Sequence, residues 1–196
     1  MITEAERERI IKRRLPFMAT TTLYRFQIEL SDVPRSIYET LDFRIAQHPS
    51  ESMPYLLTRI LAYVLNIQED LIFAPTGLHD PDAAAMNIPE LNGGFKTLIE
   101  IGSPSARKLH KATKSAKSVK VYTYKNPLTL IEEIKTEKVH RGSEIELYSL
   151  TTSFLAEIEP LLKRDNRWGI LFNDGTITIQ AGEVSISGEL STHQIF

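Results

Sequence analysis

Residues 95–126 contain the pattern that most constrains the fold, which is an apolar run, a short helical pattern and a second apolar run. The runs FKTLIEIG and SVKVYTYKN are typical of buried strands. Between them, SPSARKLHKATKSAK predicts a helix with Ser103 at its N-cap and Pro104 at its first position. A strand, helix and strand of this length form a crossover between parallel strands. The sequence therefore predicts a mixed α/β fold.

The remaining segments add an antiparallel hairpin before this unit and a β meander at the end of the chain. Residues 23–30 and 37–46 roughly alternate between apolar and polar side chains, with the turn-forming SDVPRS between them. A long helix is predicted in HPSESMPYLLTRILAYVLNI, with Ser50 at its N-cap, and a long loop is predicted at residues 76–94. Further elements are expected in DLIFAP (strand), NPLTLIEEIKTEKV (helix), SEIELYSL (strand), TTSFLAEIEPLLKR (helix) and RWGILFNDGTITIQAGEVSISGEL (meander).

Length and composition favour one globular domain. A chain of 196 residues with 42% apolar content can bury one sizeable core, whereas two complete domains would be cramped. We expect residues 18–196 to form this domain and residues 1–17 to be an N-terminal extension with a surface helix. The absence of cysteine excludes disulfides, thiolate zinc sites and a cysteine nucleophile, and no apolar window approaches the roughly 18 residues of a membrane span. We therefore expect a cytoplasmic monomer.

Positive charge is concentrated in one stretch, although the net charge of the chain is only −2. Seven lysine and arginine residues and no acid lie between Glu100 and Glu132. Most of them belong to the predicted helix, where they would form an exposed stripe that could follow the phosphates of a nucleic acid. A solvated helix surface is the other interpretation, and charge alone favours it. The candidate nucleic-acid contacts are Arg107, Lys108, Lys111, Lys114 and Lys117.

Glu100 lies in the apolar run that leads into this basic helix. Its side chain faces away from those of Ile99 and Ile101, so it could point to solvent, but both faces of a strand beside crossover units should be covered. A buried carboxylate needs a partner or a metal ion, or else it takes up a proton. Because Mg²⁺ prefers several hard oxygen ligands, we expect a second acid nearby. Asp80 and Asp82 are the candidates, although both could be ordinary turn residues.

The order of several motifs identifies a resemblance to a known family. The motifs are LYRFQIELSDVPR, HPSES followed by LLTRILAYVL, TGLHDPD, LIEIGSP, RKLHKA with VYTY, and NDGTITI. From Met18 to its end, the chain resembles the YaeQ family of small bacterial proteins. The fold of that family is a variant of the PD-(D/E)XK, or restriction-endonuclease-like, superfamily. The resemblance implies a mixed sheet flanked by helices, with the meander and the N-terminal hairpin as additions.

The resemblance also implies a metal-dependent nuclease site, in which one acid belongs to an E-x-K element whose lysine orients or activates the attacking water. Here the element reads Glu100, Ile101 and Gly102, so that lysine is missing from its usual place. We expect a lysine of the following helix to replace it. Lys111 matches by motif position, whereas Lys108 is one turn nearer the end of the strand. Of the two, Lys111 is the one that we expect to act.

The ligands that the resemblance implies for Mg²⁺, with Mn²⁺ as an alternative, are Asp82, Glu100 and the Ile101 carbonyl. Glu51, early in the long helix, matches an acid that many superfamily members place there. The implied catalytic residues are Glu100, Lys111, Asp82, Lys108 and Glu51. Two functions therefore stay open. The chain is either a magnesium-dependent phosphodiesterase that acts on nucleic acid, or a non-catalytic module that binds nucleic acid or protein through residues 107–120.

Overall fold

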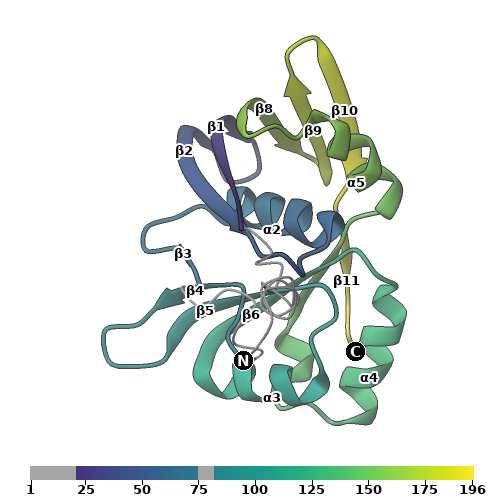
Figure 1. Cartoon of the computed structure of the whole chain (residues 1–196). Helices are drawn as coiled ribbons and strands as arrows, with labels where there is room; N and C mark the ends of the chain where they lie inside the picture. Colours follow the sequence, from purple (N-terminus) through teal and green to yellow (C-terminus); the bar gives the residue numbers. More distant parts are fainter. Residues whose placement is uncertain (1–20, 75–81) are drawn as a thin grey trace, which may run out of the picture.

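The computed structural model describes residues 21–74 and 82–196, so the expected N-terminal extension lies outside the described residues. Within these ranges the chain forms four α-helices and two mixed sheets (Figure 1). No helix in the described residues is long and apolar enough to cross a membrane. The α-helices are α2 (Met53–Leu65), α3 (Ala106–Ser115), α4 (Pro127–Thr136) and α5 (Thr152–Ile158), and the short 3₁₀ helices are η2 (Gly142–Glu144) and η3 (Glu159–Leu161).

The two sheets contain five and six strands. The five-stranded sheet has the order β10-β9-β8-β1-β2, and the six-stranded sheet has the order β11-β7-β6-β5-β4-β3. In chain order the strands are β1 (Thr22–Asp32), β2 (Ile37–Gln47), β3 (Ile72–Phe73), β4 (Met86–Pro89), β5 (Phe95–Ile101), β6 (Ala116–Thr123), β7 (Glu146–Ser149), β8 (Asp165–Asn173), β9 (Thr176–Ala181), β10 (Val184–Glu189) and β11 (Ser191–His193).

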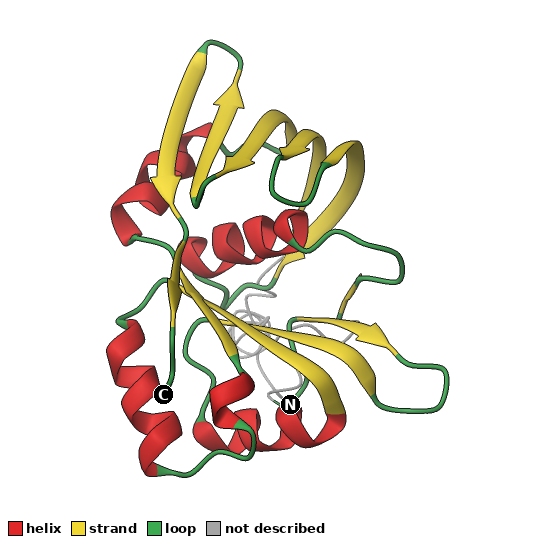
Figure 2. Ribbon diagram, turned by 180° about the vertical axis from the view of Figure 1, so that it is seen from behind, coloured by secondary structure: helices red, strands yellow, loops and turns green. Residues whose placement is uncertain are grey.

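Helix α2 lies between the two sheets, whereas α3 and α4 cover the opposite side of the six-stranded sheet (Figure 2). Nine of the thirteen α2 residues are buried. One hydrophobic core joins α2 to both sheets and includes Phe26, Ile60 and Ile99. A second core lies between the six-stranded sheet and the helices α3 and α4, where Leu98 and Leu109 are buried. Strand β5 therefore has both faces covered, as its apolar sequence predicts.

The predicted hairpin and meander are present, but their arrangement differs from the expectation. We expected both as additions to one mixed sheet. Instead, β1 pairs in parallel with β8, with Ile28 opposite Trp168, and the hairpin and meander form their own five-stranded sheet. The predicted loop at residues 76–94 was wrong in part, because Met86–Pro89 forms β4. Strand β11 was not predicted.

The predicted strand, helix and strand unit is confirmed, because β5 and β6 pair in parallel on either side of α3. The N-cap of α3 is Ser105, whose side chain accepts a hydrogen bond from the Lys108 N–H, so the prediction of Ser103 was wrong. Gly102 ends β5 with a φ of +84°, a conformation that L side chains rarely adopt. This turn sends the chain back along β5, with the first residues of α3 beside the end of the strand.

The N-cap of α2 was also assigned two residues too early. Ser52 accepts the hydrogen bond from the Tyr55 N–H, whereas Ser50 contacts the Nδ1 atom of His48 at 2.6 Å. As a result, Glu51 precedes the helix instead of belonging to its first turn. The expected proline is confirmed, because Pro54 lies in that first turn.

Candidate functional site

Glu100 is buried on the α3 side of β5. Its strand neighbours Ile99 and Ile101 belong to the core on the α2 side, so the Glu100 side chain points to the other face of the sheet, which α3 covers. Only 2% of Glu100 is exposed as a result. Its Oε2 atom lies 2.8 Å from the Nζ atom of Lys108. Burial raises the pKa of Glu100 to about 7, and the positive charge of Lys108 opposes this rise. A carboxyl group with this pKa changes its charge close to neutral pH.

Asp82 supplies a second carboxylate, paired with the next turn of the same helix. Its Oδ2 atom lies 2.6 Å from the Nζ of Lys111, and its Oδ1 lies 3.4 Å from the Nη2 of Arg107. The hydrogen bond from Lys111, together with that positive charge, lowers the pKa of Asp82. Asp82 is half exposed, in contrast to Glu100. One helix therefore presents two lysines to two carboxylates.

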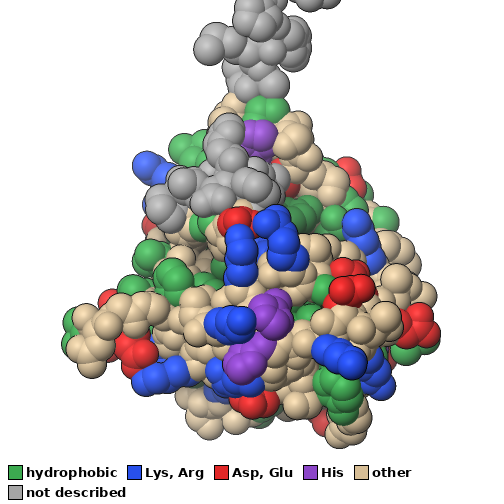
Figure 3. All heavy atoms as spheres, turned by 90° about the horizontal axis from the view of Figure 1, so that it is seen from below, with side chains coloured by type: hydrophobic (Ala, Val, Ile, Leu, Met, Phe, Trp, Pro, Cys, Tyr) green, Lys and Arg blue, Asp and Glu red, His purple; other side chains and the backbone are tan. Residues whose placement is uncertain are grey.

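These two pairs line the same pocket, which has a volume of about 510 Å³. The pocket lies between α3 and the face of strands β3, β4 and β5. Seen from the side of α3 and α4, lysine and arginine side chains gather beside acidic ones on this surface (Figure 3). The structure thus brings together four predicted site residues, which are Asp82, Glu100, Lys108 and Lys111.

The pocket offers a hard divalent cation two carboxylate groups, those of Asp82 and Glu100. The described residues contain no group of three or more histidine, cysteine or acidic side chains that could hold a metal. Two carboxylates do line one pocket, and water commonly completes the coordination of Mg²⁺. A cation here would compete with two ammonium groups, because Lys108 forms an ion pair with Glu100 and Lys111 forms one with Asp82. The Ile101 carbonyl stays a predicted ligand.

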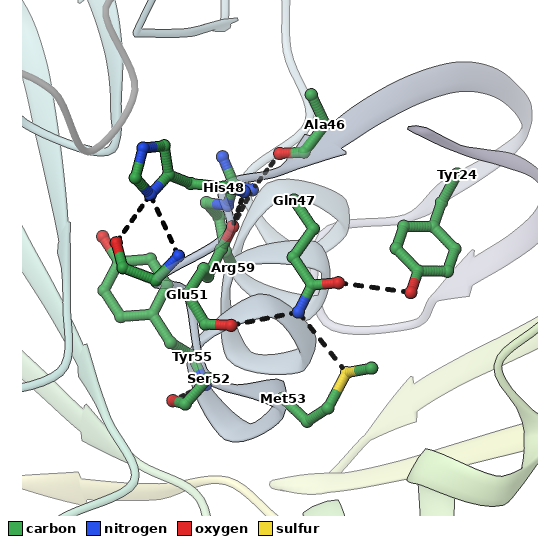
Figure 4. A network of polar contacts seen from close by, with 10 residues as sticks. Tyr24, Ala46, Gln47, His48, Glu51, Ser52, Met53, Tyr55 and Arg59 are labelled. Carbon is green, nitrogen blue, oxygen red and sulfur yellow. Dashed lines mark hydrogen bonds and ion pairs between the residues drawn. The ribbon is translucent and has the colours of Figure 1, made fainter. Parts of the chain in front are cut away.

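Glu51, the remaining acid of the predicted site, does not line this pocket. Its Oε2 atom lies 2.8 Å from the Nη2 of Arg59 and accepts a hydrogen bond from the His48 N–H (Figure 4). The Glu51 side chain is fully buried, and burial raises its pKa. Among the described residues, neither the Oε1 of Glu51 nor the Nε of Arg59 has a hydrogen-bond partner. Glu51 is thus one half of a buried ion pair beside α2.

Two tyrosines and Arg59 were not identified by sequence reasoning. A Cβ atom at Gly102 would lie 3.9 Å from the ring of Tyr55 and 3.8 Å from that of Tyr124. Burial raises the pKa of Tyr55 to about 12, and the charges of Arg59, Glu100 and Glu51 all act on its hydroxyl. The Tyr55 hydroxyl is therefore within electrostatic reach of both the buried Glu51–Arg59 pair and Glu100. The available signal was one arginine inside the apolar helix LLTRILAYVL.

The lysine and arginine side chains of the predicted basic stripe form several separate ion pairs. Arg107 and Lys111 engage Asp82, and Lys117 forms an ion pair with Glu90. Lys114 is exposed in the last turn of α3. Much of the positive charge predicted for nucleic-acid binding is therefore compensated by neighbouring carboxylates.

The ionisation of Glu100 is expected to lower the stability of the folded chain. Since the pKa rises from an ordinary value of 4.5 to about 7 on folding, the folded state binds more protons between these pH values. The free energy of unfolding should fall as pH rises through this window, and Glu100→Gln should remove this contribution. Chemical denaturation of both proteins across the window measures it. Identical pH dependence in both would contradict the prediction.

The fold and the pocket define a class, which is a mixed α/β protein of two sheets with a buried acid and lysine pair at the end of a parallel strand. The model of the YaeQ protein family matches residues 18–190, so the chain belongs to the YaeQ family.

Relatives from several bacteria support this assignment. The proteins described as "Uncharacterized protein YaeQ" from Escherichia coli (strain K12) and Salmonella typhi are 24% and 23% identical, and each alignment covers 88% of this chain and 96% of the relative. The crystal structure of the YaeQ protein from Xanthomonas axonopodis pv. citri matches with a TM-score of 0.81 at 24% identity, over 89% of this chain and 99% of that one. The crystal structure of the YaeQ protein from Pseudomonas syringae matches with a TM-score of 0.79 at 23% identity. That match covers 88% of this chain and 95% of the other one.

Proposed function

We propose that the chain is a metal-dependent phosphodiesterase that acts on nucleic acid, with its active site in the pocket beside α3. One observation carries this proposal: Glu100, Lys108, Asp82 and Lys111 converge on a single pocket. Hard carboxylate oxygens next to ammonium groups suit both a divalent cation and a phosphate. The resemblance to the PD-(D/E)XK superfamily supplies the reaction class, although fold alone does not define function.

In this proposal Asp82, Glu100 and the Ile101 carbonyl hold Mg²⁺ or Mn²⁺. When bound, the cation would activate a water molecule and neutralise charge on the phosphate. Glu100 must be ionised to act as a ligand, and the adjacent Lys108 favours its ionised form. Lys111, which is more exposed, is suited to contact the phosphate as it arrives.

Lys108 takes the role of the missing motif lysine in this proposal, in place of Lys111. The support is geometric, because the Nζ of Lys108 lies 2.8 Å from Glu100 whereas Lys111 contacts Asp82. Lys108 is also the more buried of the two, with 18% of its side chain exposed against 55% for Lys111. A charged group in such a water-poor position acts more strongly on developing negative charge.

Cleavage assays test the proposed function. Purified protein is incubated with single-stranded and duplex DNA and RNA in Mg²⁺, in Mn²⁺ and with a chelator. We expect products only with a divalent cation, and none from Glu100→Ala prepared in the same way. Glu146→Ala, which removes a half-exposed carboxylate outside the pocket, is the matched control and should retain activity.

Cleavage that survives Glu100→Ala would show that the activity has another source. Nucleic-acid binding without cleavage under any of these conditions would favour the non-catalytic binding module. Such binding should weaken with salt and with Lys111→Glu combined with Lys114→Glu.

A further inference from the structure

The pocket beside α3 is a groove with a β-sheet floor. Ile72 of β3 pairs with Asn87 of β4, and Asn87 pairs with Leu98 of β5. These three side chains form one row across the sheet, because directly paired residues point to the same face. All three line the pocket, together with Ala112 of α3. The row is apolar except for the amide of Asn87.

The groove has a charged end and a closed apolar end. Helix α3 runs back along β5, since Lys108 in its first turns contacts Glu100 at the end of the strand. At the other end, a Cβ atom on Gly94 would lie 2.9 Å from the carbonyl oxygen of Ser115, so helix and sheet meet there. From Lys108 to Ser115 the helix extends about 10 Å. Phe95 and Ser115 line this far end.

These features suit a ligand that is anionic at one end and flat and apolar at the other. At the charged end, Lys108, Lys111 and the adjacent Arg107 outnumber the carboxylates of Glu100 and Asp82 by one charge, so this end can complement a phosphate. The apolar floor with Phe95 offers contact area to a ring, and the Asn87 amide can both donate and accept hydrogen bonds along a ring edge. Among the described residues, no hydrogen bond engages the side chain of Asn87, which is half-buried. A pocket of this volume lies within the range of small-ligand sites.

We propose that the groove holds one unpaired nucleotide of the nucleic acid, with its phosphate at Lys108 and Lys111 and its base on the floor formed by Ile72, Asn87 and Leu98. This inference rests on the proposed function and specifies its substrate. A base in a duplex is stacked and paired, so it cannot enter a groove closed by a helix on one side and a sheet on the other. The preferred substrate is therefore a single strand or an unpaired strand end.

Binding measurements test this inference independently of cleavage. Fluorescence anisotropy of the full chain in chelator is recorded with a short labelled single strand, as DNA and as RNA, and with the blunt-ended duplex of the same sequence. We expect the single strand to bind about tenfold more tightly, the magnitude of one base contact. Asn87→Phe, which fills the groove on the sheet side, should remove this preference and leave duplex binding unchanged.

Ser115→Trp fills the same groove from the exposed end of α3 and should have the same effect, so the test does not depend on one variant. Ser185→Phe, an exposed strand position on β10 of the other sheet, is the matched control and should change nothing. Thermal unfolding confirms that each variant is folded.

The outcomes separate this inference from the proposed function. Equal binding of the single strand and the duplex would overturn the inference, and so would unchanged single-strand affinity in both groove-filling variants. The proposed function would still stand in either case if metal-dependent cleavage is seen and is lost in Glu100→Ala. No binding and no cleavage of any nucleic acid would overturn both.

Discussion

Lys108→Met is expected to reduce metal-dependent cleavage by about a hundredfold, the usual effect of removing one charge-stabilising group from an active site. The reason is that Lys108 is the cation next to Glu100, at 2.8 Å, and only 18% of its side chain is exposed. Lys111→Met should cause a smaller loss, mainly in KM, because Lys111 is half exposed and contacts Asp82. Steady-state kinetics of the two variants under the same conditions measure the difference.

The conservative variant Lys108→Arg separates charge from proton transfer. Arginine keeps the positive charge but cannot lose a proton near neutral pH. Recovery of activity in Lys108→Arg would assign an electrostatic role to Lys108, whereas continued loss would assign it a role in proton transfer. A large loss in Lys111→Met with near-normal activity in Lys108→Met would contradict the proposed role of Lys108 and favour the sequence-based choice of Lys111.

Arg59→Met is expected to destabilise the fold by about 3–5 kcal/mol, because it leaves the carboxylate of Glu51 buried without its cation. The Nη2 of Arg59 also donates a hydrogen bond to the Ala46 carbonyl at 2.7 Å, which ties β2 to α2. The loss should shrink at low pH, since burial raises the pKa of Glu51 and its protonation removes the unpaired charge. Chemical denaturation at two pH values measures both effects.

Two further variants serve as controls for this prediction. Arg25→Met removes an ion pair of similar length with Asp42, at 2.6 Å, but both side chains are nearly half exposed, so little change in stability is expected. Arg59→Met combined with Glu51→Gln should recover part of the lost stability, because no unpaired charge remains. If Arg59→Met were no more harmful than Arg25→Met, the buried pair would not be important for stability.

Local signals were sufficient to predict the hairpin and the unit of β5, α3 and β6, because their periodicity and turn residues are contained in short stretches. The two helix N-caps were misplaced by two residues, since each region offers two serines and only the backbone conformation selects between them. The separate five-stranded sheet depends on the parallel pairing of β1 with β8, which are far apart in the sequence. No local pattern encodes that pairing.

For the candidate site, the sequence left Glu100 either facing solvent or buried beside a basic helix, and the structure shows that it is buried. Lys108 and Lys111 are one turn apart on α3, so spacing alone directs both toward the same groove. Their division between Glu100 and Asp82 depends on how the helix is positioned over the sheet. The apolar floor of the groove depends on the register of β3, β4 and β5, where β3 has only two residues.

The most direct test of the proposed site is anomalous diffraction from crystals of the chain soaked in Mn²⁺. The proposal predicts an anomalous peak within coordination distance of the carboxylates of both Glu100 and Asp82. A peak at another location, or no peak at this pocket under Mn²⁺ concentrations that support cleavage, would contradict it.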